Sequence, residues 1–309
     1  MNTPIAIKSA IITGATGPVG LKLAELLAAR GVRMLVAANP SSTRNDALRG
    51  LPVTIEYRGL QDLEALNPAG TWDAFFHLGW TGTDSRLTRN DTLEQTKNIK
   101  YSLDAVELAS RAGCKVFVGA GSQAEYGLLP DGIARADTPV APLEAYGVAK
   151  YAAGRLSARR CAELGIRQCW GRILSVYGEY DRPTTLITYA VSSLLRGESP
   201  KFTPCEQLWD YLYAGDCAEA LWRMAVSGSH GTAYPLGSGS WQPLKEYLEE
   251  IRRQIRPEAH MGYGELPYPE GQVMRMRADM SALEADTGYK PRTNFAQAIG
   301  RLAIATCER

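Results

Sequence analysis

The segment TGATGPVG, residues 13–20, constrains the fold of this chain more than any other stretch. It joins a short apolar run, residues 6–13, to an amphipathic stretch, residues 21–31, which predicts a buried strand, a turn and a helix. In that context Gly14 permits the tight turn, Gly17 lets the backbone approach a pyrophosphate, and Gly20 lets helix and strand pack closely. The N–H groups at the helix N-terminus would face the anion. The loop therefore predicts dinucleotide binding; a glycine-rich turn without a ligand is the alternative.

Apolar runs and amphipathic stretches continue to alternate through the first half of the chain. The pattern predicts strands at 32–38, 52–59, 72–79, 115–122 and 166–174, a short helical piece at 62–70, and helices at 90–113 and 145–164. Such alternation implies βαβ units and a parallel sheet covered on both faces. Beyond residue 175 the loops lengthen, and helices are predicted at 185–196, 215–227, 243–255 and 295–306. We expect a Rossmann-type doubly wound α/β domain, residues 1–175. A smaller C-terminal α/β substrate lobe, residues 176–309, would cross back to the sheet.

Charge and composition exclude several classes of protein. The 309 residues hold 34 Lys and Arg against 33 Asp and Glu, so the net charge of +1 offers no basis for binding nucleic acid or an anionic membrane. No apolar run reaches membrane-spanning length, and the N-terminal run reads as a strand and not as a signal peptide. The six scattered cysteines form no CxxC pair, which indicates reduced thiols in a cytoplasmic protein. The three histidines show no zinc spacing, so no metal site is expected.

A second motif stands in PLEAYGVAK, residues 142–150, where Tyr146 precedes Lys150 by one helical turn. In order along the chain stand TGATGPVG, FFHLGW, GAGSQAEYG and YGVAK. Together they resemble the extended short-chain dehydrogenase/reductases, in the NAD(P)-dependent nucleotide-sugar epimerase, dehydratase and ketoreductase branch. The resemblance continues through WGRILSVYG, WDYLYAGD and ADMSALEADTGYKPRT, and so covers nearly the whole chain.

This resemblance implies a catalytic set of Ser122, Tyr146 and Lys150. Hydride transfer at a sugar carbon requires a proton to move on or off the attached oxygen. A free tyrosine has a pKa of about 10, and a nearby ammonium and a positive nicotinamide would favour its phenolate. The family pattern further implies that Lys150 binds the nicotinamide ribose and that Ser122 binds the substrate oxygen. On the pair alone, the alternative is a half-buried Tyr146 with a solvated Lys150.

The cofactor is expected to be NAD(P), with NADP slightly favoured over NAD. After the second predicted strand the chain reads AANPSSTR, with no carboxylate for a ribose 2′-hydroxyl. Polar groups there could surround a 2′-phosphate or form an ordinary turn. His77 is interpreted as a packed strand histidine. The predicted cofactor residues are Gly14, Thr16, Gly17, Pro18, Val19, Gly20, Asn39, Ser41, Ser42, Arg44, Leu60, Leu78, Gly79, Trp80, Asn98, Ala120, Tyr146, Lys150 and Ile173. Asn98 matches a helix asparagine that supports the active-site strand, or is a surface residue.

The residues after Ser122 limit which reaction of the family this chain is expected to catalyse. Family dehydratases carry an acidic pair there, whereas this chain has Gln123 and Ala124, and alanine cannot abstract a proton. Glu125, one position further along a strand, would point to the opposite face. Its carboxylate would either be satisfied by local hydrogen bonds or contact the substrate. Oxidoreduction at one carbon remains, which predicts a 4-ketoreductase or 4-epimerase acting on a nucleoside-diphosphate hexose. The preference for NADP favours the reductase slightly.

The substrate side departs from the family pattern. Trp209 stands where many members carry an arginine that contacts the diphosphate, and would stack on a base or sugar or pack within the lobe. Arg182, Arg275 and Arg277 could supply diphosphate contacts or be solvated. The predicted substrate residues are Thr81, Ser122, Gln123, Tyr146, Ser175, Arg182, Trp209 and Arg275.

Two other functions stay open: reduction of a small non-nucleotide carbonyl with NADPH, and non-catalytic sensing of dinucleotide. Sensors tend to lose the tyrosine or lysine, and this chain retains both. The family resemblance also implies a homodimer through the helix near 95–112 and the Tyr–Lys helix. Leu103, Val106 and Leu108 are compatible with that interface but could equally face the sheet.

Overall fold

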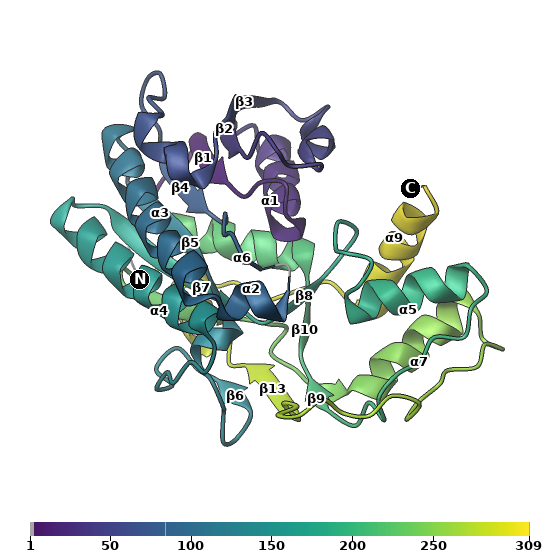
Figure 1. The fold of residues 1–309 in the computed structure, drawn as a ribbon. Coiled ribbons are helices and arrows are strands. Elements are labelled where there is room, and N and C mark those ends of the chain that lie inside the picture. Colours follow the sequence, from purple (N-terminus) through teal and green to yellow (C-terminus); the bar gives the residue numbers. More distant parts are fainter. Residues whose placement is uncertain (1–2, 84, 309) are drawn as a thin grey trace.

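A parallel sheet of seven strands forms the centre of the fold in the computed structural model, which describes residues 3–83 and 85–308 (Figure 1). The spatial order is β11, β7, β5, β4, β1, β2, β3, and every pair of neighbours is parallel. The strands span Ser9–Thr13 (β1), Arg33–Ala38 (β2), Val53–Tyr57 (β3), Ala74–His77 (β4), Val116–Ser122 (β5), Arg167–Ile173 (β7) and Thr232–Leu236 (β11). The predicted Rossmann-type α/β fold is confirmed.

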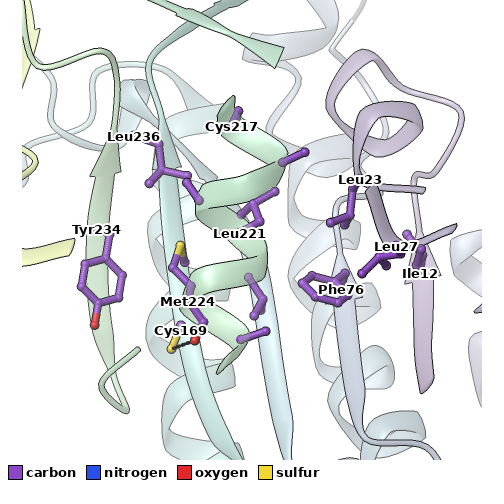
Figure 2. Packing of buried hydrophobic residues seen from close by; sticks show 14 of the residues in the cluster. Ile12, Leu23, Leu27, Phe76, Cys169, Cys217, Leu221, Met224, Tyr234 and Leu236 are labelled. Atoms are coloured by element: carbon purple, nitrogen blue, oxygen red, sulfur yellow. Dashed lines mark hydrogen bonds between the residues drawn. The ribbon is translucent and has the colours of Figure 1, made fainter. Parts of the chain in front are cut away.

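Helices cover both faces of this sheet because its strands are apolar on both sides. On one face lie α1 (Pro18–Ala29) and α6 (Ala214–Ser227), which pack against each other. Figure 2 shows Leu221 and Met224 of α6 beside Leu236, and Leu23 of α1 near Phe76. On the other face, α3 (Thr92–Arg111) and α4 (Ala145–Glu163) pack together over the cluster that contains Phe75 and Phe117. Each fully buried side chain of this size stabilises the fold by roughly 1.5–3 kcal/mol.

The C-terminal part of the chain builds a second layer of helices beyond the sheet. Helices α5 (Leu186–Leu195), α7 (Leu244–Ile255) and α9 (Phe295–Cys307) enclose an aromatic core that includes Tyr177 and Tyr247, and they lie together at the right of Figure 1. Small sheets connect this layer to the main one. They contain β6 (Ile133–Ala134), β8 (Ser175–Tyr177), β9 (Leu208–Trp209), β10 (Tyr211–Tyr213), β12 (Gln242–Pro243) and β13 (Arg275–Ala278). Helix α8 (Ser281–Thr287) packs on α6.

The chain returns to the main sheet after residue 213. Helix α6 packs on α1, and β11 adds an edge strand beside β7. The strand pattern in the sequence did not identify β11. The division of the chain into domains at residue 175 stays a prediction, and its outermost residues, 1–2 and 309, lie outside the described structure. Across residues 3–83 and 85–308, no helix is long and apolar enough to cross a membrane.

Several element boundaries differ from the sequence prediction. The helix expected at 90–113 is α3, which begins at Thr92 because the Asp91 carboxylate accepts from the backbone N–H groups of Leu93 and Glu94. A separate short helix, α2 (Arg86–Asn90), precedes it and was not predicted. The helical piece at 62–70 is a 3-10 helix, Leu60–Ala65. Strand β5 ends at Ser122, and Gln123–Glu125 form a 3-10 turn. The alternation of a strand therefore does not apply to Glu125.

The indole of Trp170, on β7, is wedged between β5 and α4. Glycines make the room: a Cβ atom at Gly119 would lie 2.1 Å from the indole, one at Gly121 2.3 Å and one at Gly154 2.8 Å. The GAGS segment that ends at Ser122 is therefore glycine-rich because the ring occupies the space of the missing side chains. This packing sets the distance between the strand that carries Ser122 and the helix that carries Tyr146.

We expect Gly119→Ala to destabilise the protein by about 1–3 kcal/mol, since the added methyl group must displace the buried indole. Gly300→Ala is the matched control: Gly300 lies inside α9, with nothing within 4 Å of its Cβ position, so alanine should stabilise by about 0.5–1 kcal/mol. Urea unfolding of the two variants measures both changes. Equal stability of Gly119→Ala and wild type would contradict the conclusion that the Trp170 indole fills the space at Gly119.

Candidate functional site

Ser122, Tyr146 and Lys150 converge at the carboxyl end of β5. Ser122 is the last residue of that strand, and the other two lie in the first turns of α4. The Ser122 side chain lies close enough to the Tyr146 phenol to influence its ionisation, and Lys150 Nζ donates to the Ala120 carbonyl at 2.6 Å. Helix α4 approaches closely because Gly147 faces the Ala124 carbonyl, where a Cβ atom would lie only 2.3 Å away. The alternative of a solvated lysine is wrong, because Lys150 is 4% exposed.

Burial shifts the protonation of both groups. It lowers the pKa of the Lys150 ammonium to about 7, partly opposed by the charge of Glu125. The centroid of the Trp80 ring lies 3.7 Å from Lys150 Nζ, so the face of the ring stabilises the cation. Burial raises the pKa of the Tyr146 phenol, while the Ser122 side chain and the Arg89 charge lower it. The arrangement holds a tyrosine and a titratable ammonium side by side, away from water.

The Glu125 carboxylate supports this arrangement from inside the fold. It accepts from the Ser122 backbone N–H at 2.8 Å, from Trp170 Nε1 at 2.9 Å and from Arg172 Nε at 2.8 Å. Glu125 is completely buried, and Arg172 is nearly so. Of the two predicted alternatives, the one in which hydrogen bonds satisfy this carboxylate is confirmed. The sequence offered no sign that Trp170 and Arg172 would be its partners.

The glycines of the loop after β1 differ in what surrounds the position of their missing Cβ atom. Gly14 has φ of 71°, and a Cβ atom there would lie 2.5 Å from the Gly79 nitrogen; at Gly20 it would lie 2.2 Å from the Gly14 carbonyl oxygen. Packing alone explains both. Gly17 has an ordinary φ of −77°, and the nearest atom to its Cβ position is 3.4 Å away. The missing side chain at Gly17 leaves open backbone at the N-terminus of α1, which has no side-chain cap, so the loop fits a pyrophosphate.

Other predicted cofactor residues lie around this loop, and two of them, Leu78 and Gly79, directly follow the neighbouring strand β4. Gly79 packs against the Leu60 side chain, which a Cβ atom would approach to 2.8 Å. Thr16, Pro18, Val19 and Leu78 are partly exposed at this edge of the sheet, and Ile173 pairs with Ser122 across β7 and β5. His77 lies beneath, paired with Thr13 Oγ1 at 2.9 Å and Ser102 Oγ at 3.1 Å. Burial lowers its pKa to about 3, and the interpretation as a packed strand histidine is confirmed.

The turn after β2 is built partly from its own polar groups. Asn39 Oδ1 accepts from the Ser41 N–H, and Ser42 Oγ accepts from the Arg44 N–H. No carboxylate occurs at positions 39–45, and Arg44 is partly exposed. Asn39 therefore shapes the turn, whatever else it binds.

Helix α3 holds the segment that follows β4. Asn98 Oδ1 accepts from the Thr81 N–H at 2.9 Å, and Asn98 Nδ2 donates to the Thr81 carbonyl. Trp80 Nε1 donates to Gln95 Oε1 at 2.9 Å. The alternative of a surface Asn98 is wrong, since it is 1% exposed; the segment that it supports is residue 81 and not β5. Gln95, also buried, was not identified from the sequence.

The predicted substrate residues fall into two groups. Gln123 and Thr81 lie close in sequence to Ser122 and Trp80, both at the carboxyl edge of the main sheet. Trp209 Nε1 donates to Ser175 Oγ at 2.8 Å, so these two residues are brought together. Trp209 is partly buried and packs against two hydrophobic clusters, as the lobe-packing alternative predicts. Arg275 is exposed on β13, beside the strand of Trp209, and Arg182 follows β8.

Within residues 3–83 and 85–308, no group of three or more His, Cys, Asp or Glu could hold a metal ion.

Comparison with known proteins agrees with this geometry. Residues 10–237 match the NAD dependent epimerase/dehydratase family. The chain is 26% identical over 195 residues to dTDP-glucose 4,6-dehydratase of Streptomyces niveus, covering 63% of this chain and 58% of that protein. It is 23% identical over 291 residues to CDP-abequose synthase of Salmonella muenchen, covering 89% and 90%.

A solved structure shares the whole fold. UDP-N-acetylglucosamine 4-epimerase from Methanobrevibacter ruminantium M1, in complex with UDP-N-acetylmuramic acid, superimposes with a TM-score of 0.88 at 21% identity, covering 98% of this chain and 99% of that chain. The family match spans more than half of the chain and includes the glycine loop, Ser122, Tyr146 and Lys150. The chain therefore belongs to the NAD dependent epimerase/dehydratase family, and is an NAD(P)-binding enzyme of the extended short-chain dehydrogenase/reductase type.

Proposed function

We propose that this protein catalyses NAD(P)-dependent oxidoreduction at C4 of a nucleoside-diphosphate hexose, as a 4-ketoreductase or a 4-epimerase. The observation that carries the proposal is the buried meeting of Ser122, Tyr146 and Lys150 at the carboxyl edge of the sheet. Ligands of parallel α/β sheets bind at this edge. The open backbone at Gly17 is the second support, because it provides a place for the pyrophosphate of the cofactor.

The residues of the site divide the chemistry between them. The bound nicotinamide supplies or accepts the hydride. Tyr146 gives a proton to the sugar oxygen as a carbonyl is reduced, and takes it back when a hydroxyl is oxidised. Ser122 holds that oxygen by a hydrogen bond, and Lys150, when protonated, stabilises the tyrosinate. An epimerase uses both directions in one turnover, whereas a reductase uses the first alone.

Dehydration is not proposed, although a relative is named a 4,6-dehydratase. The base that removes the C5 proton would follow Ser122, where this chain has Gln123 and Ala124. Glu125 does not replace it, because its carboxylate is buried and receives three hydrogen bonds. A group held in this way is not free to take a proton from a substrate.

The nucleotide-sugar substrate is proposed from the family and from the solved relative that holds a UDP-linked sugar. Trp209, Arg182 and Arg275 would form the nucleotide side of the site. NADP is proposed over NAD because the turn after β2 carries Arg44 and no carboxylate.

A homodimer and a cytoplasmic location also stay proposals. Val106 and Leu108 are buried against the sheet and are unavailable to a partner, whereas Leu93 of α3 and Val148 of α4 are exposed. These exposed side chains support an interface on the same two helices. Five of the six cysteines are buried as free thiols, which suits a reducing compartment.

The proposed function is tested with a panel of nucleoside-diphosphate 4-keto-6-deoxy sugars and hexoses. We expect stoichiometric loss of NADPH absorbance with one keto sugar, or interconversion of two C4 epimers without net cofactor change. Tyr146→Phe should lower turnover by about 10²–10⁴-fold while still binding cofactor. An inactive wild type with the whole panel, or full turnover by Tyr146→Phe, would contradict the proposal.

The two alternative functions give different results in the same assays. A dinucleotide sensor keeps its function in Tyr146→Phe, and a reductase of small carbonyls does not bind free UDP, dTDP, CDP or GDP. Calorimetric binding of one of these nucleotides, which Trp209→Ala should weaken, favours the nucleotide-sugar substrate.

Gly17→Ala should weaken dinucleotide binding at least tenfold without unfolding the protein, because only a ligand would occupy the space that its Cβ atom fills. Gly20→Ala is the steric counterpart, whose methyl group meets the Gly14 carbonyl and should cost about 1–3 kcal/mol of stability. Calorimetry with NADP⁺ and urea unfolding separate the two effects. Unchanged affinity in Gly17→Ala would show that the loop does not hold the pyrophosphate.

Cofactor affinity should depend on pH through Lys150. Burial places the pKa of Lys150 near 7 in the free protein, and a ribose hydroxyl bound to the ammonium favours the protonated form. Affinity for NAD⁺ should therefore be highest below pH 7 and fall by up to about tenfold per pH unit above it. NAD⁺ is preferred as the probe because it lacks the titrating 2′-phosphate. Lys150→Met should bind more weakly and without this slope; the same slope in the variant would assign it to another group.

A further inference from the structure

Arg89, on the short helix α2, contacts the catalytic tyrosine directly. Its guanidinium carbon lies 4.2 Å from the centroid of the Tyr146 ring. Arg89 Nε and Nη2 both donate to Glu144 Oε2, at 3.0 and 2.8 Å. Glu144 is the N-cap residue of α4, two positions before Tyr146. The ion pair therefore holds the planar guanidinium against the ring from a separate element.

The phenol is also restrained from its other sides. The Trp80 ring meets the Tyr146 ring edge-on, with centroids 5.9 Å apart. Trp80 is in turn fixed by Gln95, a buried residue of α3. The ring is thus held by α2, by the segment after β4 and by its own helix, so its orientation does not depend on a bound ligand.

The charged groups around Tyr146 come from three elements. Lys150 Nζ on α4 lies 5.9 Å from the ring centroid, Arg89 stacks from α2, and the carboxylates are Glu144 at the start of α4 and Glu125 in the 3-10 turn. Arg89 lowers the pKa of Tyr146, whereas Glu125 and Glu144 raise it. The pKa of Lys150 is about 7, so this lysine loses its charge as the pH rises above neutrality. A guanidinium stays charged throughout that range.

We propose that Arg89 is a positioning residue for Tyr146: its stacked guanidinium orients the ring and keeps a fixed positive charge beside the phenol. The proposal rests on the proposed function in one respect, that Tyr146 is the group that moves the proton. It goes beyond the Ser–Tyr–Lys set, because Arg89 lies in none of the motifs that identify the site.

The test compares Arg89→Met with Glu144→Gln, because both variants break the same ion pair but remove charges of opposite sign. Titration of Tyr146 is followed by near-ultraviolet phenolate absorbance, as the difference between each protein and the same protein carrying Tyr146→Phe. In Arg89→Met the titration should move up by about one pH unit, and in Glu144→Gln it should move down by a fraction of a unit. Arg89→Lys retains the charge and should titrate close to the wild type.

Opposite shifts in the two variants support the proposal, and the pH profile of turnover should move with them. Shifts in the same direction, or no shift, overturn it, because the ion pair would then act only by holding the helices together. The phenolate measurement does not need turnover. Opposite shifts in a protein that is inactive with every substrate would therefore reject the proposed function and leave the electrostatic role of Arg89 standing.

Discussion

The carboxylate of Glu125 lies at the point where the strands, the catalytic helix and the active-site serine meet. A buried carboxylate is costly to hold unless donors replace the water it has lost. Here a backbone N–H at the end of β5 and two side chains of β7 donate to it. Because one of these donors is the N–H of Ser122, satisfying the buried charge also fixes the position of the serine. The reacting edge of the sheet thus depends on an interaction that has no part in the chemistry.

Glycines determine how closely the elements around this carboxylate approach one another. Gly119, Gly121 and Gly154 leave the space that the Trp170 indole fills, and Gly147 lets α4 touch the turn that follows Ser122. Without these close contacts, Tyr146 would stand further from Ser122. Missing side chains also matter in the first loop. Gly14 and Gly20 allow close packing there, and Gly17 leaves room for a ligand.

Burial shifts the pKa values of Lys150 and Tyr146 and so sets how their protonation depends on pH. Removing Lys150 from water weakens its hold on a proton, and the same burial opposes ionisation of Tyr146. A pair of desolvated groups therefore needs further charges to set which one carries the proton. Arg89 and Trp80 surround the pair with a fixed cation and an aromatic face. The protein environment, and not the Tyr–Lys spacing alone, sets the pH range in which tyrosine could act.

The family resemblance implied that Ser122 meets Tyr146 and Lys150. Local spacing in the sequence was enough to predict the strand–glycine–helix unit, the parallel sheet and the Tyr146–Lys150 pair. Each depends on a periodic pattern or on residues one helical turn apart, so neighbouring positions determine them. The sequence predicted that the chain crosses back to the sheet, but it did not reveal that β11 pairs with β7, that Trp209 is paired with Ser175, or that Arg89 stacks on Tyr146. Each of these joins residues that are distant in the chain. Only the folded structure brings them together, because packing and the burial of charge select such contacts among many that local sequence permits equally.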